Sequence, residues 1–379
     1  MSRLNINNLT NENEDGSPRI SGISTFSSPH YFVPPSGTTA ERPQNPGEEM
    51  IRFNTDSGHL EYYTGEFWDD VIVANNELGV NGALGHRGVF AGGYVPGGGG
   101  DQSRIDYVTI STLGDAITFG DLSQSRRGLS GCGSATRGLF MGSSGASPQR
   151  IDFITYSSTG NATTFGTLST NKEGNGALSS STRAISFGGD NVGSGTNVIE
   201  YMTIASTSNG IDFGDLLNSQ TTFTGGIASS TRGVMGGGNV YPAQNATNSI
   251  QYITISTLGN SLDFGDLTAP RGNGAAVSNS TRGLLMGGYE FPTRVDTIEY
   301  VTIVSTGNAQ DFGDLLVATN SFAACSSPTR ALYGGGTAPT TTNTMGYVTI
   351  LSTGNALDFG DLTIARFNLA ACSNGHGGL

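Results

Sequence analysis

A short motif that recurs at a nearly fixed interval constrains this chain more than any other feature. In each copy an arginine precedes an apolar run that ends in glycine, as in TRGLFMGS, TRGLLMGG and TRALYGGG. The arginines stand 46 to 50 residues apart, at Arg87, Arg137, Arg183, Arg232, Arg282 and Arg330. A last, truncated copy has Gly377 where the arginine would be. A period of this length is typical of folds assembled from one repeated supersecondary unit.

Each repeat predicts four short strands. In the fifth repeat they cover residues 275–277, 284–286, 298–303 and 311–315, and turns rich in Gly, Asn and Ser separate them. Side chains along the third segment alternate between two faces, as in a strand. Four such strands form one antiparallel sheet. Six sheets arranged radially predict an all-β fold, a six-bladed β-propeller over residues 78–379.

The sequence contains seven candidates for the first strand of a sheet, although only six sheets are predicted. One follows each of the six repeats, and a weaker candidate lies near Leu84, ahead of the first repeat. The C-terminal segment 367–373 matches the repeat better than the segment around Leu84 does. We therefore expect residues 367–373 to return to the first sheet and close the ring, which would bring His86 and His376 together.

The recurring arginine has two interpretations. Several inward-facing arginines could bind a carboxylated sugar, but a residue that recurs with the fold is more often structural. We expect it to pair with the equally periodic aspartate of Phe-Gly-Asp-Leu, in a charge-assisted hydrogen bond that contributes about 1.5 to 3 kcal/mol. The predicted structural set is Arg137, Arg183, Arg232, Arg282 and Arg330 with Asp121, Asp215, Asp266, Asp314 and Asp361, and Thr167 replaces the aspartate in the second repeat.

The sequence predicts neither a metal site nor catalysis. Phe-Gly-Asp-Leu supplies one carboxylate per repeat, which is much sparser than a calcium-binding loop. Three cysteines share a repeat position that is apolar in the other repeats, so they are expected to be buried free thiols: Cys132, Cys325 and Cys372, against Leu178, Ile227 and Val277. No known motif assembles a nucleophile, a base and an orienting group. We predict a protein that is not an enzyme and that has no cofactor.

The loops between the second and third strands carry the candidate binding residues. All six loops are expected on one rim of the ring, and binding residues favour loops held by a rigid scaffold. Four aromatic residues in them offer surface of the kind that stacks on sugars: Tyr94, Tyr241, Tyr289 and Phe291. The alternative is that these loops are only solvated connections.

Charge and hydropathy exclude two classes of partner. The formal net charge is −13, so the field of the protein repels nucleic acid and anionic lipid. No apolar run reaches the length of about 18 residues that a membrane-spanning helix needs, and the first residues lack the apolar core of a signal peptide. We expect synthesis in the cytoplasm, with no nucleic-acid partner and no membrane insertion.

The first 75 residues differ in composition from the repeats. Residues 1–49 are rich in Asn, Ser, Pro and Glu without a sustained period, which predicts an extended arm or linker. Residues 50–75 predict a β-hairpin, because apolar segments flank the turn signal at 54–58. Phe67 and Trp68 end this element.

Two resemblances follow from these segments. The repeats over residues 78–379 resemble kelch-type propellers, through the arginine-led strand, the Gly-Gly ending and the aromatic third strand. The tryptophan usual in that family is absent, and phenylalanine takes its place at Phe119, Phe165, Phe213, Phe264, Phe312 and Phe359. The likeness is therefore one of architecture.

The segment RPQNPGEEMIRFNTDSGHLEYYTGEFW, residues 42–68, resembles a segment near the N-termini of virion structural and tail-fibre-like proteins of marine cyanobacterial phages. The matching pieces are Arg42-Pro43, residues 50–55, residues 60–63 and residues 65–68. This resemblance implies a β-rich adaptor or oligomerisation element, tethered to other virion proteins through residues 1–75.

The resulting expectation is a virion structural protein, a homo-oligomer in the particle, which displays the propeller as a tail fibre or appendage and contacts a host-surface glycan or receptor. One alternative is a capsid decoration protein without a ligand. Another is a polysaccharide-degrading enzyme, which would need a pair of loop carboxylates. The acidic residues found in the loops are spread over three repeats: Asp101, Asp190, Glu290 and Asp296.

Overall fold

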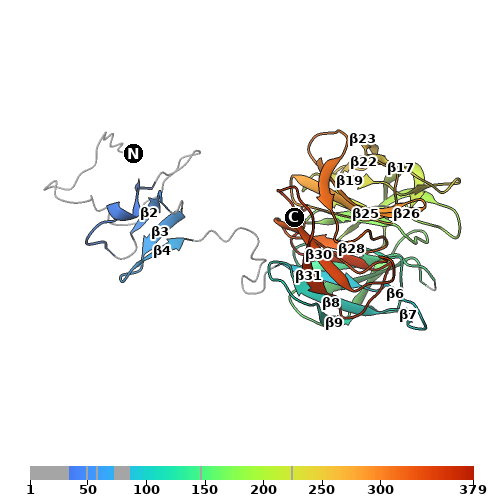
Figure 1. Cartoon of the computed structure of the whole chain (residues 1–379), viewed down its shortest axis with the longest axis horizontal. Helices are drawn as coiled ribbons and strands as arrows, with labels where there is room; N and C mark the ends of the chain where they lie inside the picture. The colour runs from blue at the N-terminus through green and yellow to red at the C-terminus, as the bar shows by residue number, and fades with distance from the viewer. Residues whose placement is uncertain (1–33, 48–49, 57–58, 72–85, 146, 223–224) are drawn as a thin grey trace, which may run out of the picture. The chain divides into compact units, whose positions relative to one another are not determined.

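The structure is a computed structural model that describes residues 34–47, 50–56, 59–71, 86–145, 147–222 and 225–379. The chain divides into two compact units, Met1–Val73 and Ala74–Leu379, and each is described by itself. In Figure 1 the first unit is blue and the second runs from cyan to red. No helix in the described part of the chain is long and apolar enough to cross a membrane.

The first unit is a four-stranded sheet in the order β1-β2-β3-β4. Its elements are β1 (Ser36–Gly37), the 3-10 turn η1 (Thr39–Glu41), β2 (Ile51–Asn54), β3 (His59–Tyr63) and β4 (Trp68–Val71). The predicted hairpin is confirmed, since β2 and β3 pair antiparallel with Ile51 opposite Tyr62. Strand β1 pairs parallel with β2, so residues 36–37, expected in the arm, belong to the sheet. Residues 1–33 of that arm lie outside the described residues.

The second unit contains six four-stranded antiparallel units, one for each repeat. The all-β class and the four strands predicted for each repeat are confirmed. In order from first to fourth strand, the sheets are: first, β32 (Ala370–Ser373), β5 (Arg87–Ala91), β8 (Arg104–Thr109), β9 (Ile117–Asp121); second, β10 (Ser130–Gly133), β11 (Arg137–Met141), β12 (Arg150–Thr155), β13 (Thr163–Thr167); third, β14 (Gly176–Ser179), β15 (Arg183–Phe187), β16 (Thr196–Thr203), β17 (Ile211–Thr221); fourth, β18 (Gly225–Ala228), β19 (Arg232–Gly236), β22 (Ser249–Thr254), β23 (Leu262–Asp266); fifth, β24 (Ala275–Ser278), β25 (Arg282–Glu290), β26 (Thr293–Thr302), β27 (Gln310–Asp314); sixth, β28 (Ala323–Ser326), β29 (Arg330–Gly334), β30 (Thr344–Thr349), β31 (Leu357–Asp361).

Short strands in two loops complete the second unit. One small hairpin, β6 (Tyr94–Val95) and β7 (Gly100–Asp101), belongs to the loop of the first repeat. Another, β20 (Asn239–Val240) and β21 (Asn245–Ala246), extends the third sheet by pairing with the end of β17. Loops of neighbouring repeats are therefore joined by backbone hydrogen bonds.

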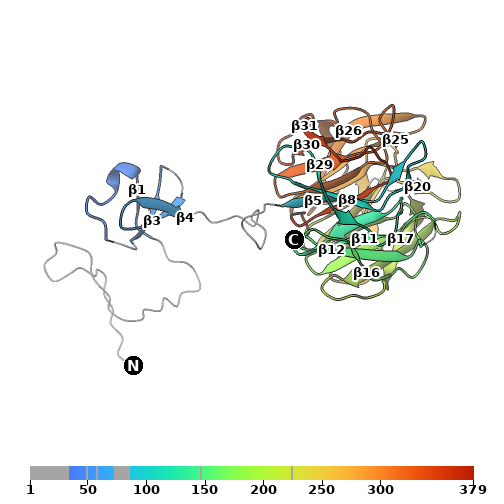
Figure 2. The same ribbon diagram turned by 90° about the horizontal axis from the view of Figure 1, so that it is seen from below.

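The C-terminal strand returns to the first sheet, as predicted. Strand β32 pairs antiparallel with β5, with Cys372 opposite Val89, and the C-terminus therefore lies beside β5 (Figure 2). The side-chain oxygen of Asn374 also accepts the backbone N–H of Arg87 at 2.8 Å. The first strands of the six sheets contact one another in a closed cycle. The first and last repeats thus meet through one shared sheet.

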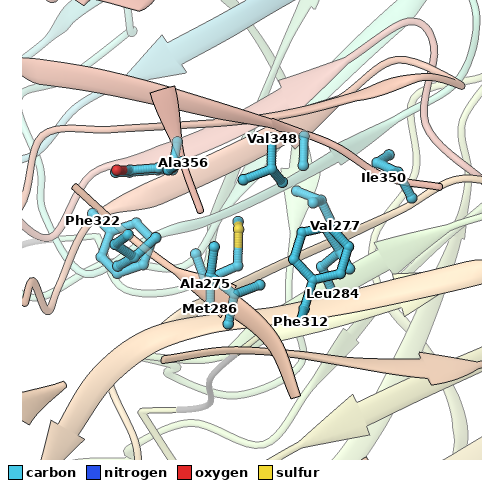
Figure 3. Close-up of a cluster of buried hydrophobic side chains, with 13 residues drawn as sticks. Ala275, Val277, Leu284, Met286, Phe312, Phe322, Val348, Ile350 and Ala356 are labelled. Carbon is cyan, nitrogen blue, oxygen red and sulfur yellow. The ribbon is translucent and has the colours of Figure 1, made fainter. Parts of the chain in front are cut away.

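The hydrophobic core lies between neighbouring sheets. Figure 3 shows the cluster between the fifth and sixth sheets, where Leu284 and Phe312 of one sheet pack with Val348 and Ile350 of the next. Five further clusters of this kind occur in the described part of the unit. The predicted burial of the three thiols is confirmed, because all three cysteines are free and buried between such sheets.

The outer edge of each fourth strand is covered by a turn from the next repeat. In β23 the carbonyl of Phe264 accepts the N–H of Gly307 at 2.8 Å, and the N–H of Asp266 donates to Oδ1 of Asn308 at 3.1 Å. Gly265 has φ 147°, and a Cβ there would lie 2.5 Å from the carbonyl oxygen of Gly307. The same acceptor at the other boundaries is Asn161, Asn209, Asn260, Asn355 or Asp115. This pairing leaves no long bare edge to template aggregation there.

Candidate binding face at the axial mouth

The recurring arginine does not pair with the aspartate of Phe-Gly-Asp-Leu, so this prediction was wrong. Arg282 donates from Nη1 to the carbonyl oxygens of Ile350 and Leu351 in the next sheet, at 3.1 and 3.0 Å. Its guanidinium also lies 4.5 Å from the ring centroid of Tyr300. Corresponding contacts are made by Arg87, Arg137, Arg183, Arg232 and Arg330.

Register explains why the predicted pair cannot form. Arg282 stands opposite Thr302 at one end of β26, whereas Asp314 stands opposite Thr297 nearer its other end. Five residues of strand separate the two levels by roughly 16 Å. The arginine joins neighbouring sheets by hydrogen bonds and a cation–π contact, while the aspartate uses its backbone N–H at the sheet edge.

A second set of charges, missed in the sequence, forms buried ion pairs between repeats. At four of the six first strands, a cation in the preceding linker contacts an acid on the third strand of the same sheet. The pairs are Arg366–Asp106 at 3.0 Å, Arg126–Asp152 at 3.0 Å, Lys172–Glu200 at 3.1 Å and Arg271–Glu299 at 2.6 Å. Burial lowers the pKa of Arg366 and Arg126 to about 10, and the neighbouring carboxylate opposes that shift. Both guanidinium groups therefore stay charged at neutral pH.

The two remaining repeats change both partners together. In the fourth sheet Nε2 of Gln251 donates to Oε1 of Gln220 at 2.6 Å. In the sixth sheet the two positions are Thr319 and Gly346, and the hydroxyl end of Tyr333 lies against Gly346. The residues at the two positions change together from one repeat to the next. This covariation between repeats of one chain could have identified the contacts from the sequence.

Six backbone hydrogen bonds form a closed ring where the first strands begin. In each bond the donor nitrogen lies 2.7 to 2.9 Å from the acceptor oxygen. All six residues are in the left-handed region, with φ between 49° and 67°. In donor order the ring, called the mouth ring below, runs Gly128, Asn368, Ser321, Asn273, Thr222, Gly174 and back to Gly128. Glycine and asparagine suit this backbone better than the β-branched Thr222 does.

A polar cavity of about 150 Å³ opens at the mouth ring. It is lined by Asn273, Ser321 and Asn368 together with small residues of the first strands, such as Gly131 and Ala276. Small side chains are required because six strands converge here. A Cβ on Gly131, for example, would lie 2.5 Å from the carbonyl oxygen of Ala371. Residues at or beside the first strands of all six sheets line this cavity.

The C-terminal tail covers the opposite end of the axis. His376 Nε2 lies 2.7 Å from the carbonyl oxygen of Gly133, and its Nδ1 accepts the N–H of Gly378 at 3.1 Å. Burial lowers the pKa of His376 to about 4. His86 lies against Gly375, so the two chain ends of the ring meet as expected. Both imidazole nitrogens of His376 are used structurally, in the neutral tautomer that carries the proton on Nε2.

The four predicted aromatic residues do not form one cluster. Tyr94 is enclosed by the guanidinium of Arg127, 4.7 Å from its ring centroid, and by Phe367 at 5.5 Å. Tyr241 donates its hydroxyl to Asp190 at 2.8 Å, and burial and this bond raise its pKa to about 12. These two partly exposed rings are therefore already engaged by neighbouring side chains of the protein.

Tyr289 and Phe291 form a separate aromatic pair on the fifth repeat. Their ring centroids are 6.2 Å apart, and Phe291 is 82% exposed. Tyr289 exchanges backbone hydrogen bonds with Gly272 at 2.7 and 3.2 Å, and Gly272 precedes Asn273 of the mouth ring. The pair therefore stands beside the mouth cavity.

A carboxylate pair that the sequence did not indicate also lies near the mouth ring. Glu173 and Asp190 exchange backbone hydrogen bonds at 3.1 and 2.7 Å, although Asp190 had been the only loop acid found in that repeat. Glu173 was missed because it lies in the linker before the first strand, next to Gly174. Like charges opposite one another oppose pairing, and Tyr241 offsets part of this by donating to Asp190. Within the described residues, no three His, Cys, Asp or Glu side chains gather as a metal site.

No protein-family model matches this chain. No curated protein matches it either.

Proposed function

We propose that this chain is a phage virion structural protein whose N-terminal region attaches it to the particle. The second unit is a six-bladed propeller of kelch-like architecture, displayed as part of a tail fibre or appendage. The observation that carries this proposal is the resemblance of residues 42–68 to a segment of phage virion proteins. The geometry of that segment supports it, as follows.

The resembling segment is organised around one buried carboxylate. Glu61 is fully buried and contacts Arg42 at 2.6 Å, Arg52 at 3.6 Å and Nδ2 of Asn54 at 3.1 Å. The hydrogen bond from Arg42 holds the pKa of Glu61 below its ordinary value. The characteristic residues of the segment are thus those that interlock its strands.

The opposite face of the same sheet is apolar and exposed. Ile51 and Phe53 alternate with the buried Arg52 and Asn54 along β2, and Tyr62 stands opposite Ile51. Among the described residues of this unit, the fully buried side chains are all polar. A small domain whose described residues bury no apolar side chain needs further stabilisation, for instance by oligomerisation. This supports attachment to another virion protein or to further copies of this chain.

The closed cycle of first strands, the shared first sheet and the mouth ring support the propeller architecture. The rim beside the mouth ring carries loop residues from every repeat on a rigid scaffold, which suits recognition of a host-surface glycan or receptor. The attachment and recognition roles thus lie on separate units of the chain.

Particle composition tests this proposal. The chain is expected in purified virions at a fixed copy number, and Phe53→Asp is expected to reduce its incorporation. Leu258→Asp, which changes an exposed aliphatic residue of the second unit, is the control and should be incorporated normally. Presence of the chain only in lysate, never in virions, would refute attachment to the particle.

The carboxylate pair favours a second candidate, a polysaccharide-degrading enzyme. Glu173 and Asp190 occupy directly paired backbone positions beside the mouth cavity, and glycoside cleavage uses two such carboxyl groups. Depolymerisation of a host polysaccharide by the full chain, abolished by Glu173→Gln, would support this candidate. A chain that binds polysaccharide without shortening it would contradict it.

A further inference from the structure

The hairpin of the fifth repeat stays paired as far as its tip, with one shift in register between Met286 and Gly288. Strands β25 and β26 contain 9 and 10 residues, whereas the second strands of the other sheets contain 5. The ladder continues through Tyr289 opposite Arg294 and Glu290 opposite Thr293, which leaves two residues in the turn. A side chain on this tip is therefore held by paired strands.

One face of the tip combines aromatic surface with a guanidinium. Phe291 meets Tyr289 edge to face, at 74° between the ring planes. Arg294 stands directly across the ladder from Tyr289. Directly opposed residues of an antiparallel pair have Cβ atoms about 5 Å apart, so these side chains share one face.

One hydrogen bond orients the side chain of Arg294, and its terminal nitrogens remain available as donors. Its Nε donates to Oδ1 of Asn320 in the next repeat at 2.9 Å. No hydrogen bond or ion pair with another described residue involves its terminal nitrogens. By contrast, Arg127 uses a terminal nitrogen on Asp101, and Arg150 uses one on Ser123 and Thr164.

This tip adjoins the mouth cavity on both sides. Tyr289 is bonded to Gly272, the neighbour of Asn273, and Asn320 is the neighbour of Ser321. Both Asn273 and Ser321 line the cavity of about 150 Å³. The hairpin is therefore anchored to the residues that precede two members of the mouth ring.

We propose that Phe291, Tyr289 and Arg294 form a saccharide-binding site. A pyranose ring stacks its C–H face on Phe291, while its oxygen atoms accept hydrogen bonds from the terminal nitrogens of Arg294. Aromatic faces and planar guanidinium donors are suited to these two parts of a sugar. The inference deepens the proposed function, on which it rests, because it names the ligand class and the residues that a displayed ring would use.

The terminal nitrogens of Arg294 could donate either to the hydroxyl of a neutral sugar or to the carboxylate of a uronate. The experiment distinguishes these two kinds of saccharide. Binding of maltotriose and of trigalacturonate to the full chain is measured by saturation-transfer NMR. We expect one of them to bind, and Phe291→Ala to weaken it at least tenfold. Arg294→Gln should weaken trigalacturonate more than maltotriose if the carboxylate is the preferred group.

Ile117→Ala is the matched control, since Ile117 is 61% exposed on the fourth strand of the first sheet. It should leave binding unchanged. Because Phe291 is so exposed, its variant should keep the wild-type melting temperature. If neither saccharide binds, or if both tip variants bind like the wild type, the inference is overturned. A chain found in virions that binds neither saccharide would overturn this site and leave the proposed virion role standing.

Discussion

Arg366 and Asp106, 260 residues apart in the sequence, form a buried ion pair with 3.0 Å between Nη2 and Oδ2. Arg366 precedes the C-terminal strand and Asp106 lies on the third strand of the first sheet. The pair therefore repeats, at the junction of the chain ends, the contact that Arg126, Lys172 and Arg271 make within the chain. The first and last repeats are therefore joined by the same kind of ion pair that joins the other repeats with charged partners.

Removing one partner of a buried ion pair should destabilise the protein more than replacing both partners with neutral residues. Arg271→Gln should lower the free energy of unfolding by about 3 to 5 kcal/mol, because Glu299 is left buried without its cation. The double variant Arg271→Gln, Glu299→Gln should recover more than half of that loss, since it recreates the Gln220–Gln251 contact of the fourth sheet. Urea denaturation measures both. A double variant no more stable than the single one would contradict this account.

The recurring arginine should be coupled to the aromatic residue and uncoupled from the aspartate. Arg282→Met removes two hydrogen bonds to carbonyls and a cation–π contact, and should cost about 1 to 3 kcal/mol. A double-mutant cycle with Asp314→Asn should give a coupling energy near zero. The corresponding cycle with Tyr300→Leu should give about 0.5 to 1 kcal/mol. Strong coupling to Asp314 would restore the pairing that the structure contradicts.

The turn that covers each fourth strand needs a side-chain oxygen that accepts a backbone N–H, and this oxygen need not belong to asparagine. Asn308→Ala should destabilise by about 1 kcal/mol, because the N–H of Asp266 loses its partner. Asn308→Asp should stay close to the wild type, since Asp115 accepts the equivalent bond at the boundary between the sixth and first sheets. Thermal unfolding compares the two variants. Equal losses would show that side-chain packing, and not the acceptor, matters.

The tail over the axis should make stability depend on pH. The pKa of His376 is about 4 in the native state, below its ordinary value of 6.5. As the pH falls from 6.5 towards 4, the unfolded state binds a proton that the native state does not, so stability decreases by up to about 3 kcal/mol. His376→Gln should flatten this part of the profile. A variant with the same slope as the wild type would contradict the assignment.

Strand order and closure were predictable because they depend on local periodicity. The match of residues 367–373 to the other first strands was enough to predict β32 beside β5. The burial of Cys372 followed in the same way, because Leu, Ile and Val occupy its position in other repeats. Both inferences use the repeat as its own internal comparison.

Contacts between repeats were harder to predict. Arg282 and Asp314 both recur with the repeat, and only the register of β26 shows that they lie at different levels of the sheet. Glu173 and Asp190 come from different segments that a loop bridge brings together. The roles of Tyr94 and Tyr241 also depended on neighbours from other repeats, Arg127 and Asp190. Periodicity identifies the strands, and the packing of one sheet on the next decides the site.

The proposed place of the chain in the virion can be tested by immunogold electron microscopy of purified phage particles, with an antibody against the second unit. We expect gold at one regular location on the virion, such as a fibre or appendage, in particles made with the wild-type chain. Particles made with Phe53→Asp should carry much less gold. Absence of gold from intact wild-type virions, with the chain recovered only as free protein, would contradict this proposal.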